Sequence, residues 1–264
     1  MPPIKHALLG ASSAHRWMVC TPSAMLDSSY EDKPSEAAAE GTLAHAIAEA
    51  RLTSRLSGKR WAKTPKALKE DPLYRPGMDE DVDIYVDYIL DERNRVLSEN
   101  PEVLLEQRVD YSPYAPNGFG TADCLMLHGD KLDVFDFKYG KHVFVEAENN
   151  PQLKLYALGA MVCMDPLGMI NTVRTHIIQP RMENIGSVVY TASELIEWGE
   201  KVVKPIAELA SKGEGELIPG EHCTFCKHRF RCRARAEQQQ KLNLIRYDGE
   251  RVRTPDELDR KSVV

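Results

Sequence analysis

Residues 120–138 read GTADCLMLHGDKLDVFDFK, and this stretch decides how the middle of the chain folds. It contains two runs that favour strands, 121–128 and 132–138, separated by Gly129 and Asp130. A Gly-Asp pair between two such runs is typical of a tight hairpin turn. We therefore expect two neighbouring antiparallel strands here.

The triplet Asp136-Phe137-Lys138 lies at the end of the second strand. Side chains two residues apart in a strand point to the same face, so Asp136 and Lys138 should lie together. Two other D/E-x-K triplets, at 31–33 and 259–261, lie in polar surroundings, whereas this one lies on an apolar strand. Because burying these charges is costly, the triplet indicates either an internal salt bridge or a reactive site.

A second carboxylate, Asp123, lies at the start of the first strand, and the hairpin should bring it near Asp136. Two adjacent carboxylates repel each other unless a cation lies between them, so the pair favours a divalent metal site. His45 follows Gly41 by four residues on a predicted helix and could add a ligand. A single helical histidine is, however, more often a buried core residue.

Three further polar residues lie on neighbouring elements. Gln152 and Tyr156 are four residues apart on a predicted helix at 151–164, so both should face the same way. Glu106 lies on the strand predicted at 103–109. It is either an outer carboxylate of the same site or a solvent-exposed residue.

Helices and strands alternate along the rest of the chain. Periodicity and capping signals predict helices at 12–26, 35–56, 79–99, 151–164, 193–210 and 228–241, with a basic loop at 57–78. Strands are predicted at 103–109, 121–128, 132–138, 173–179 and 186–190. This order predicts an α/β fold with a central mixed β-sheet flanked by helices. Residues 243–264 are polar, and we expect a weakly ordered tail there.

The six cysteines fall into two groups. Cys124 and Cys163 lie in apolar runs and are expected in the core. Three others have the spacing C-x2-C-x5-C in a polar, basic segment: Cys223, Cys226 and Cys232. Such thiolates favour a metal that needs a fourth ligand. That ligand is either a local histidine, His222 or His228, which would indicate zinc, or the distant Cys20.

Composition places the 264-residue chain among globular proteins, with 42% hydrophobic and 28% charged residues. A chain of this length buries enough surface to fold without disulfides. No apolar run approaches the ~18–20 residues that span a bilayer, and the N-terminus does not resemble a secretory signal. We therefore expect a soluble, cytoplasmic protein that has no membrane partner.

The net charge of −6 argues against wholesale coating of nucleic acid, but two runs are basic and contain no acid. One, at 51–69, contains seven basic residues; the other, at 227–235, contains five. Each run is either a solvated face or part of a surface for a polyanion. The second run provides the candidate nucleic-acid ligands Arg229, Arg231, Arg233 and Arg235.

In chain order, these residues form four short motifs: Gly41/His45, Gly120/Asp123, Asp136/Lys138 and Gln152/Tyr156. This order resembles the RecB-type branch of the PD-(D/E)XK nucleases, which includes the nuclease domains of RecB and AddB and the CRISPR-associated RecB-like nucleases. The resemblance covers about residues 12–236 and is closest to phage-encoded members. The segment SSAHRWMVCTPS, at 12–23, and one cysteine upstream with three downstream resemble the part of the family that carries an iron–sulfur cluster. An insertion at about 57–102 has no role assigned by the resemblance.

The resemblance implies a restriction-endonuclease-like core that hydrolyses phosphodiester bonds in DNA. It implies that His45, Asp123, Asp136 and the carbonyl of Phe137 hold Mg²⁺ or Mn²⁺. It implies that Lys138 orients the attacking water and offsets the charge of the transition state. Gln152 and Tyr156 would hold either the DNA backbone or the surroundings of the metal.

The resemblance also implies a [4Fe–4S] cluster that joins the N- and C-terminal segments. Its ligands would be Cys20, Cys223, Cys226 and Cys232. Zn²⁺ at the same four cysteines satisfies the same ligand count.

These inferences predict one nuclease domain at 1–242, with a core at about 36–210 and cluster-binding segments at about 12–26 and 220–236. The expected activity is exonuclease-type processing of DNA ends. The expected partners are DNA and a phage recombination or replication protein in the host cytoplasm. One alternative is a catalytically weak DNA-binding scaffold or recombination accessory protein built on the nuclease fold. Another is a zinc-ribbon binding module next to an unrelated α/β domain.

Overall fold

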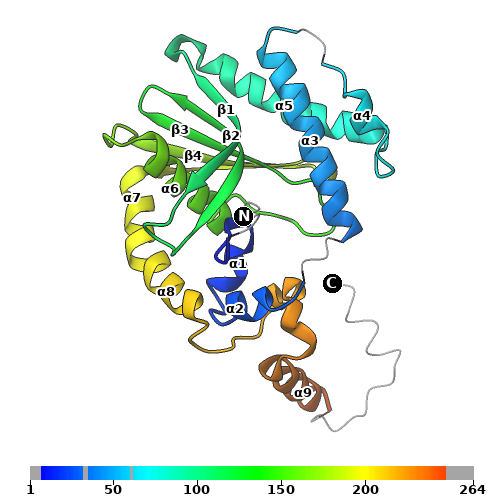
Figure 1. The fold of residues 1–264 in the computed structure, drawn as a ribbon, viewed down its shortest axis with the longest axis vertical. Helices are drawn as coiled ribbons and strands as arrows, with labels where there is room; N and C mark the ends of the chain where they lie inside the picture. The colour runs from blue at the N-terminus through cyan, green and yellow to red at the C-terminus, as the bar shows by residue number, and fades with distance from the viewer. Residues whose placement is uncertain (1–6, 32–34, 60–61, 248–264) are drawn as a thin grey trace.

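A single mixed sheet forms the centre of the molecule (Figure 1). The computed structural model describes residues 7–31, 35–59 and 62–247. The strands are β1 (Glu102–Asp110), β2 (Phe119–His128), β3 (Lys131–Phe137), β4 (Thr172–Gln179) and β5 (Asn184–Thr191), in the spatial order β1-β2-β3-β4-β5. Only the β3–β4 pair is parallel; the other neighbours are antiparallel. The predicted α/β fold with a mixed sheet and a β2–β3 hairpin is confirmed.

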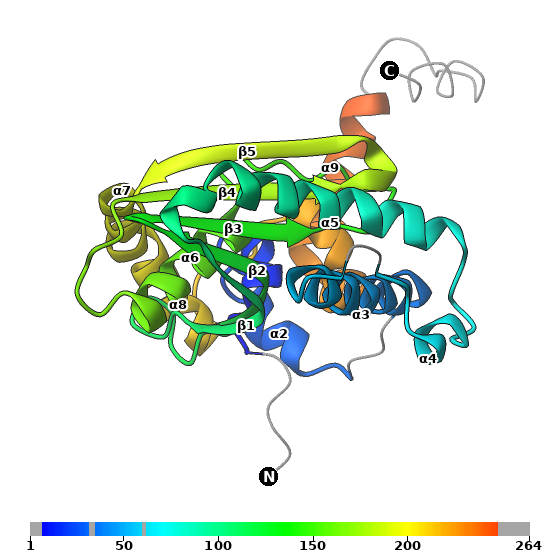
Figure 2. The ribbon, with the colours of Figure 1, turned by 90° about the horizontal axis from the view of Figure 1, so that it is seen from above.

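Helices cover both faces of the sheet (Figure 2). They are α1 (Ala14–Trp17), α2 (Ser23–Ser28), α3 (Glu36–Leu56), α4 (Lys66–Lys69), α5 (Gly77–Arg95), α6 (Pro151–Met164), α7 (Ala192–Trp198), α8 (Lys204–Lys212) and α9 (Arg233–Tyr247). A π-helical turn at Gly199–Val203 joins α7 to α8. The α6, α7 and α8 helices share one core with the N-terminal segment, while α3 and α5 build a second core on the opposite face.

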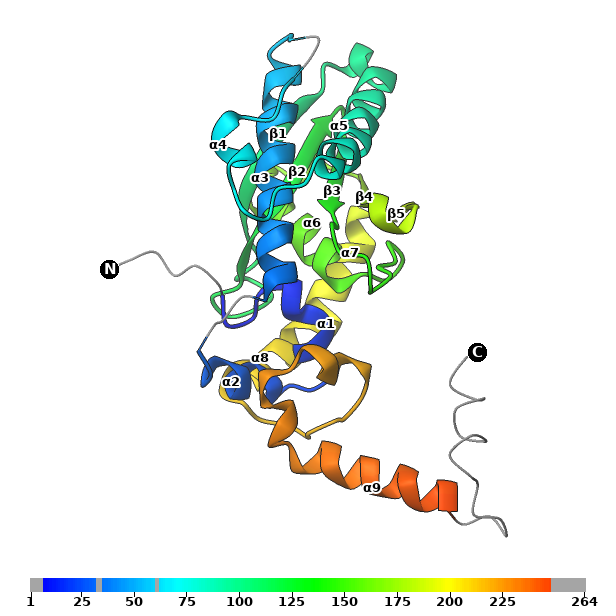
Figure 3. The ribbon, with the colours of Figure 1, turned by 90° about the vertical axis from the view of Figure 1, so that its right-hand side faces the viewer.

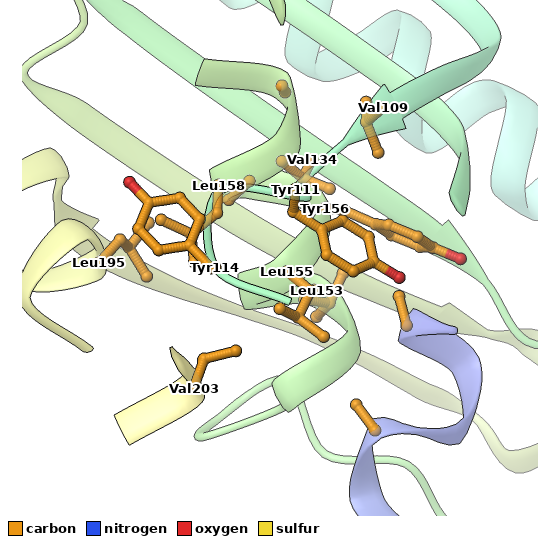
Figure 4. Packing of buried hydrophobic residues seen from close by; sticks show 14 of the residues in the cluster. Val109, Tyr111, Tyr114, Val134, Leu153, Leu155, Tyr156, Leu158, Leu195 and Val203 are labelled. Atoms are coloured by element: carbon orange, nitrogen blue, oxygen red, sulfur yellow. The ribbon is translucent and has the colours of Figure 1, made fainter. Parts of the chain in front are cut away.

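The core beneath α6 fixes the position of that helix (Figure 4). The side chain of Asn150 caps α6 by accepting hydrogen bonds from the backbone N–H groups of Gln152 and Leu153, and Pro151 occupies the first helical position. Leu155 and other apolar side chains of α6 are fully buried between the sheet and α7. The first turn of α6, which carries Gln152, is therefore held rigidly next to the end of β3.

The prediction of one continuous helix at 12–26 is wrong. The segment forms a 3-10 turn at Ala11–Ser13, the short α1, a turn and then α2. A proline disfavours helical geometry at the residue before it, and Thr21 precedes Pro22. Thr21 Oγ1 instead donates a hydrogen bond to the carbonyl of Glu214, 2.5 Å away.

The C-terminal segment also differs from its prediction. The helix expected at 228–241 begins only at Arg233, because the preceding residues form 3-10 turns at Glu221–Phe225 and Lys227–Phe230. Figure 3 shows α9 extending away from the rest of the fold. It continues to Tyr247, past the expected start of the tail; residues 248–264 of that tail lie outside the described residues.

The basic run at 51–69 does not form a free basic face. It contains α4 where a loop was expected, and three ion pairs join it to the acidic helix α5: Arg51–Asp83, Arg55–Asp87 and Lys69–Asp79. Arg60 lies outside the described residues. Much of the charge of this run is therefore neutralised within the fold.

The two cysteines expected in the core behave differently. Cys124 in β2 is fully buried. Cys163 is exposed near the end of α6, where its thiol accepts a hydrogen bond from the backbone N–H of Asp110. The expectation for Cys163 is wrong, because the last turn of α6 passes the edge of the sheet.

A buried ionic network ties α5 to the sheet. Asp133 in β3 lies 2.7 Å from His128 Nε2, 3.0 Å from His176 Nε2 and 2.6 Å from Arg174 Nε. Arg174 also contacts Glu92 of α5 at 2.6 Å. Burial alone would raise the pKa of Asp133, but hydrogen bonds from His176 and Arg174 outweigh it and lower the pKa to about 2.

We expect Asp133→Asn to lower the free energy of unfolding by on the order of 3 kcal/mol, because it removes the buried anion that Arg174, His128 and His176 all contact. The folded pKa of Asp133 lies below its unfolded value of ~3.9. Its contribution is therefore present above that pH and is lost as the pH falls toward about 2. Urea denaturation between pH 2 and pH 7 measures both effects. The exposed Asp91→Asn, on α5, is the control; an equal loss in the two variants would contradict the prediction.

Candidate active site

Asp136 and Lys138 contact each other at the end of β3. Lys138 Nζ lies 2.8 Å from Asp136 Oδ2, and Gln152 Nε2 donates to Asp136 Oδ1 over 2.9 Å. Oδ2 has Lys138 as its partner, and Asp136 is only 1% exposed. Burial raises the pKa of Asp136, Lys138 opposes that effect, and the charge of Asp123 adds to it. The salt bridge that the sequence allowed is therefore present.

Asp123 lies beside His45 of α3. Its Oδ1 is 3.4 Å from His45 Nδ1, and its Oδ2 accepts a hydrogen bond from the backbone N–H of Phe137 over 2.7 Å. Burial lowers the pKa of His45, but the charge of Asp123 outweighs this effect and raises the pKa to about 9. Burial likewise raises the pKa of Asp123, and His45 outweighs it, so that the net shift is downward. The hairpin therefore brings Asp123 within electrostatic range of Asp136.

Glu106 completes a group of possible metal ligands. His45, Glu106 and Asp123 each offer a ligand atom, and these atoms lie within 4.8 Å of one another. Burial raises the pKa of Glu106 to about 7, and the charge of Asp123 adds to this rise. The backbone of Glu106 has φ +46°, a left-handed conformation that is costly for a residue other than glycine.

The alternation of side chains between the two faces of the sheet is interrupted at Glu106 in β1 and at Asp123 in β2. Regular alternation would place Leu105 and Val109 on one face of β1, yet Leu105 packs against the α3/α5 core and Val109 lies in the α6 core. In β2, Cys124 and Ala122 are separated in the same way. Glu106, whose backbone is left-handed, lies between Leu105 and Val109 and opposite Asp123. The pairing of β1 with β2 keeps the same register on both sides of Glu106, so the interruption is not a β-bulge with an extra residue.

Gln152 and Tyr156 form a hydrogen-bonded chain behind the carboxylates. Gln152 Oε1 accepts from Lys138 Nζ over 2.9 Å, and Gln152 Nε2 lies 3.1 Å from the hydroxyl of Tyr156. Tyr156 is only 6% exposed, and a Cβ at Gly120 would lie 2.7 Å from its ring. Glycine is therefore required at position 120. The pair orients Lys138 and Asp136, and Tyr156 is too buried to contact a DNA backbone directly.

Phe137 lies beneath these ligands. Its ring is 5.3 Å from the ring of His45 and 4.7 Å from that of Tyr85 in α5. This packing excludes water from one side of the site and fixes the imidazole. The expected role of the Phe137 carbonyl as a metal ligand stays a prediction.

These donors fit a hard divalent cation. His45, Glu106 and Asp123 offer ligand atoms from α3, β1 and β2, and Asp136 at the end of β3 lies within electrostatic range of Asp123 and His45. Oxygen ligands with a single imidazole suit Mg²⁺ and Mn²⁺, and the imidazole favours Mn²⁺ of the two.

All four candidate cluster ligands line one cavity between the terminal segments: Cys20, Cys223, Cys226 and Cys232. Within the described part of the chain, no three of their Sγ atoms lie within 4.8 Å of one another. Burial raises the pKa of Cys20, and it raises the pKa of Cys226 to about 11. The alternative ligands His222 and His228 line the same cavity, with one ring nitrogen of each engaged by Ile218 and Tyr30.

Direct bonds also join the terminal segments. Arg16 pairs with Asp27 at 2.8 Å and donates to the carbonyl of Phe225 over 2.8 Å. Asp27 accepts a hydrogen bond from the backbone N–H of Lys227 over 2.7 Å. The chain ends are thus held together around the cavity by contacts that involve no cysteine.

The four arginines proposed for nucleic acid differ in their surroundings. Arg229 donates to the carbonyl of Thr224, Arg235 donates to the carbonyl of Arg229, and Arg233 pairs with Glu237. Arg231 lines a wide surface hollow with Tyr30 and His228. Their part in DNA binding stays a prediction.

Residues 6–263 match a family model described as "Protein of unknown function (DUF2800)". The chain belongs to the DUF2800 family. Among solved structures, it is similar to a crystal structure named "Putative exonuclease" from Eubacterium rectale, with 11% identity, a TM-score of 0.46 and coverage of 87% of this chain and 88% of that one. It is also similar to the structure of SSO0001, with 11% identity, a TM-score of 0.35 and coverage of 84% and 96%. At these scores neither likeness bears on the activity of the DUF2800 chain.

Within residues 7–31, 35–59 and 62–247, no helix of the DUF2800 chain is both long and apolar enough to cross a bilayer.

Sequence reasoning left Glu106 undecided in this DUF2800 chain. Its place in the site depends on a left-handed backbone conformation, which strand periodicity does not predict. The available signal was weak: an acidic residue inside the otherwise strand-like run VLLEQRV.

We expect Mn²⁺ to raise the melting temperature of the wild-type protein and to do so less in Glu106→Gln. A cation that binds only the folded state adds about 2.7 kcal/mol at a hundredfold excess over its Kd, and each tenfold loss of affinity removes about 1.4 kcal/mol. Calorimetric melting over a Mn²⁺ series measures the difference. Glu102→Gln, an exposed residue of the same strand, is the control. Equal shifts in all three proteins would exclude Glu106 as a ligand.

Proposed function

We propose that this chain is a metal-dependent DNA nuclease that hydrolyses phosphodiester bonds, with end processing in recombination or replication as its expected role. One observation carries the proposal. His45, Glu106 and Asp123 offer ligand atoms within 4.8 Å of one another, and the Asp136–Lys138 pair lies within electrostatic range of Asp123 and His45. A structural salt bridge explains Asp136 and Lys138, but it does not explain a strained glutamate facing a second carboxylate.

In this mechanism, His45, Glu106, Asp123 and Asp136 would hold Mg²⁺ or Mn²⁺. When bound, the cation would polarise a phosphate oxygen and acidify a water. Lys138 would hold the attacking water by its ammonium and offset the negative charge that develops on the phosphate. Gln152 would keep Lys138 aimed at this position, since its amide bonds both Lys138 and Asp136. Phe137 and Tyr85 would keep bulk water from one side.

We expect Lys138→Ala to reduce DNA cleavage by at least about 10²–10³-fold, because it removes one preorganised cation from the reacting phosphate. Asp136→Asn should abolish cleavage as well. Digestion of linear and circular DNA in a Mg²⁺ and Mn²⁺ series measures this loss, and circular dichroism checks the fold. Lys141→Ala, an exposed lysine three residues farther on, is the control.

Two outcomes would count against this assignment. Full activity of Lys138→Ala would remove the lysine from the mechanism. If the wild-type protein cleaves no form of DNA with any divalent metal but still binds DNA, the fold serves as a binding scaffold.

We also propose that Cys20, Cys223, Cys226 and Cys232 bind a [4Fe–4S] cluster with a structural role. The four cysteines line one cavity between the terminal segments, and this shared lining supports a common metal group there. Two buried polar atoms of the cavity lining, Arg16 Nε and Ser23 Oγ, lack hydrogen bonds and could donate to the sulfurs of a bound cluster.

Such a cluster would close a loop of about two hundred residues. By analogy with a disulfide, this cross-link would add about 4–5 kcal/mol to the free energy of unfolding. We expect anaerobically purified protein to contain about four irons per chain. Cys20→Ser should lose iron and lower the stability of the whole domain, whereas Cys163→Ser should retain both. Metal analysis and urea denaturation measure these effects; one zinc per chain without iron would overturn the iron assignment but retain the ligands.

A further inference from the structure

Two phenylalanine rings in the cysteine segment face solvent. Phe225 is 51% exposed and Phe230 is 82% exposed. Phe144, in the connection between β3 and α6, is also 56% exposed, whereas Phe135 and Phe137 in β3 are fully buried. The guanidinium of Arg229 lies over the ring of Phe230 at 4.6 Å. Arg229 is itself anchored by hydrogen bonds to the carbonyls of Thr224 and Cys226. The rings are therefore displayed on an ordered segment, and exposing them costs free energy that packing does not recover.

The first of these rings, Phe225, packs against α1. His15 of α1 contacts Phe225 edge-on, with 6.0 Å between ring centroids. Arg16 holds the backbone of Phe225 by a hydrogen bond to its carbonyl. Burial lowers the pKa of His15, and the charges of His222 and Lys138 add to the effect. His15 therefore lies within electrostatic range of both the cysteine segment and the active site.

The stretch of chain around Phe230 is basic. From Lys227 to Arg235 there are five basic residues and no acid. Arg233 is neutralised by Glu237, but Arg229 and Arg231 flank Phe230 directly in sequence. Exposed aromatic rings interleaved with arginines are the combination that binds single-stranded nucleic acid, because rings stack on unpaired bases and cations follow the phosphates. A duplex keeps its bases stacked inside and offers such rings nothing to stack on.

We propose that Phe225 and Phe230 form a base-stacking surface for the unpaired bases of a single-stranded DNA end as it reaches the active site. This proposal rests on the proposed nuclease function, whose substrate it narrows to DNA with a single-stranded end. Arg229 and Arg231 hold the backbone beside the rings, and His15 contacts the ring of Phe225.

Binding of a labelled poly-thymidine strand to the full-length protein, without divalent metal, tests the proposal. We expect Phe230→Ala to weaken binding about 5- to 100-fold, which is the usual effect of losing one contact between an aromatic ring and a base in proteins that bind single-stranded nucleic acid. The dependence of affinity on salt should not change, because no charge is removed. Phe225→Ala should act in the same direction, Phe230→Trp should restore affinity, and binding to a blunt duplex should not change in any of these variants. Iron content and circular dichroism verify that the cysteine segment is intact.

Leu167→Ala is the matched control, because Leu167 is also 82% exposed but lies in the α6–β4 connection. Unchanged binding by Phe230→Ala, or an equal loss for the duplex or for Leu167→Ala, would overturn the stacking surface. The nuclease function would survive that result if the wild-type protein still cleaves DNA with Mn²⁺. A wild-type protein that neither binds nor cleaves any DNA would instead refute the function itself.

Discussion

A buried carboxylate at the end of β3 constrains most of what surrounds it. Asp136 is almost completely removed from water, so its charge must be compensated locally or the residue must be neutral. Lys138 compensates part of it from the same strand, and Gln152 bonds both side chains. Gln152 reaches them only because α6 begins where Asn150 caps it. The core packing and the capping of α6 therefore place Gln152 where it can bond this charged pair.

The compensation remains incomplete. Three carboxylates face one lysine and one histidine, and the pKa of Glu106 rises to about 7 because burial and Asp123 disfavour its charge. At the same residue the backbone is held in a left-handed conformation. Strain and uncompensated charge at one position are costs that a purely structural site would not be expected to accumulate. A divalent cation would relieve the electrostatic cost, and this is the physical reason to interpret the cluster as a metal site.

Much of the architecture could be predicted from sequence because it depends on local patterns. The hairpin of β2 and β3, the capped helix α6 and the order of strands follow from periodicity and turn residues. These patterns also placed Asp136 next to Lys138 and Gln152 next to Tyr156.

What could not be predicted depends on contacts between distant segments. The position of Glu106 depends on a backbone inversion opposite Asp123, and the helix expected at 12–26 gives way to a turn that bonds Glu214. The basic run at 51–69 looked like a surface for a polyanion because its acidic partners lie on another helix, α5.

The segment 57–102, to which the sequence assigned no role, forms one wall of the candidate site. Its helix α5 places Tyr85 against Phe137, and Phe137 in turn contacts the ring of His45. The same helix is fastened to β3 and β4 through Glu92, Arg174 and Asp133. Without α5, the α3/α5 face of the sheet would be exposed to water, and Phe137, whose ring contacts the imidazole, would lose its contact with Tyr85. Since a lower local dielectric strengthens every charge interaction in the site, α5 would support the proposed chemistry without contributing a reacting group.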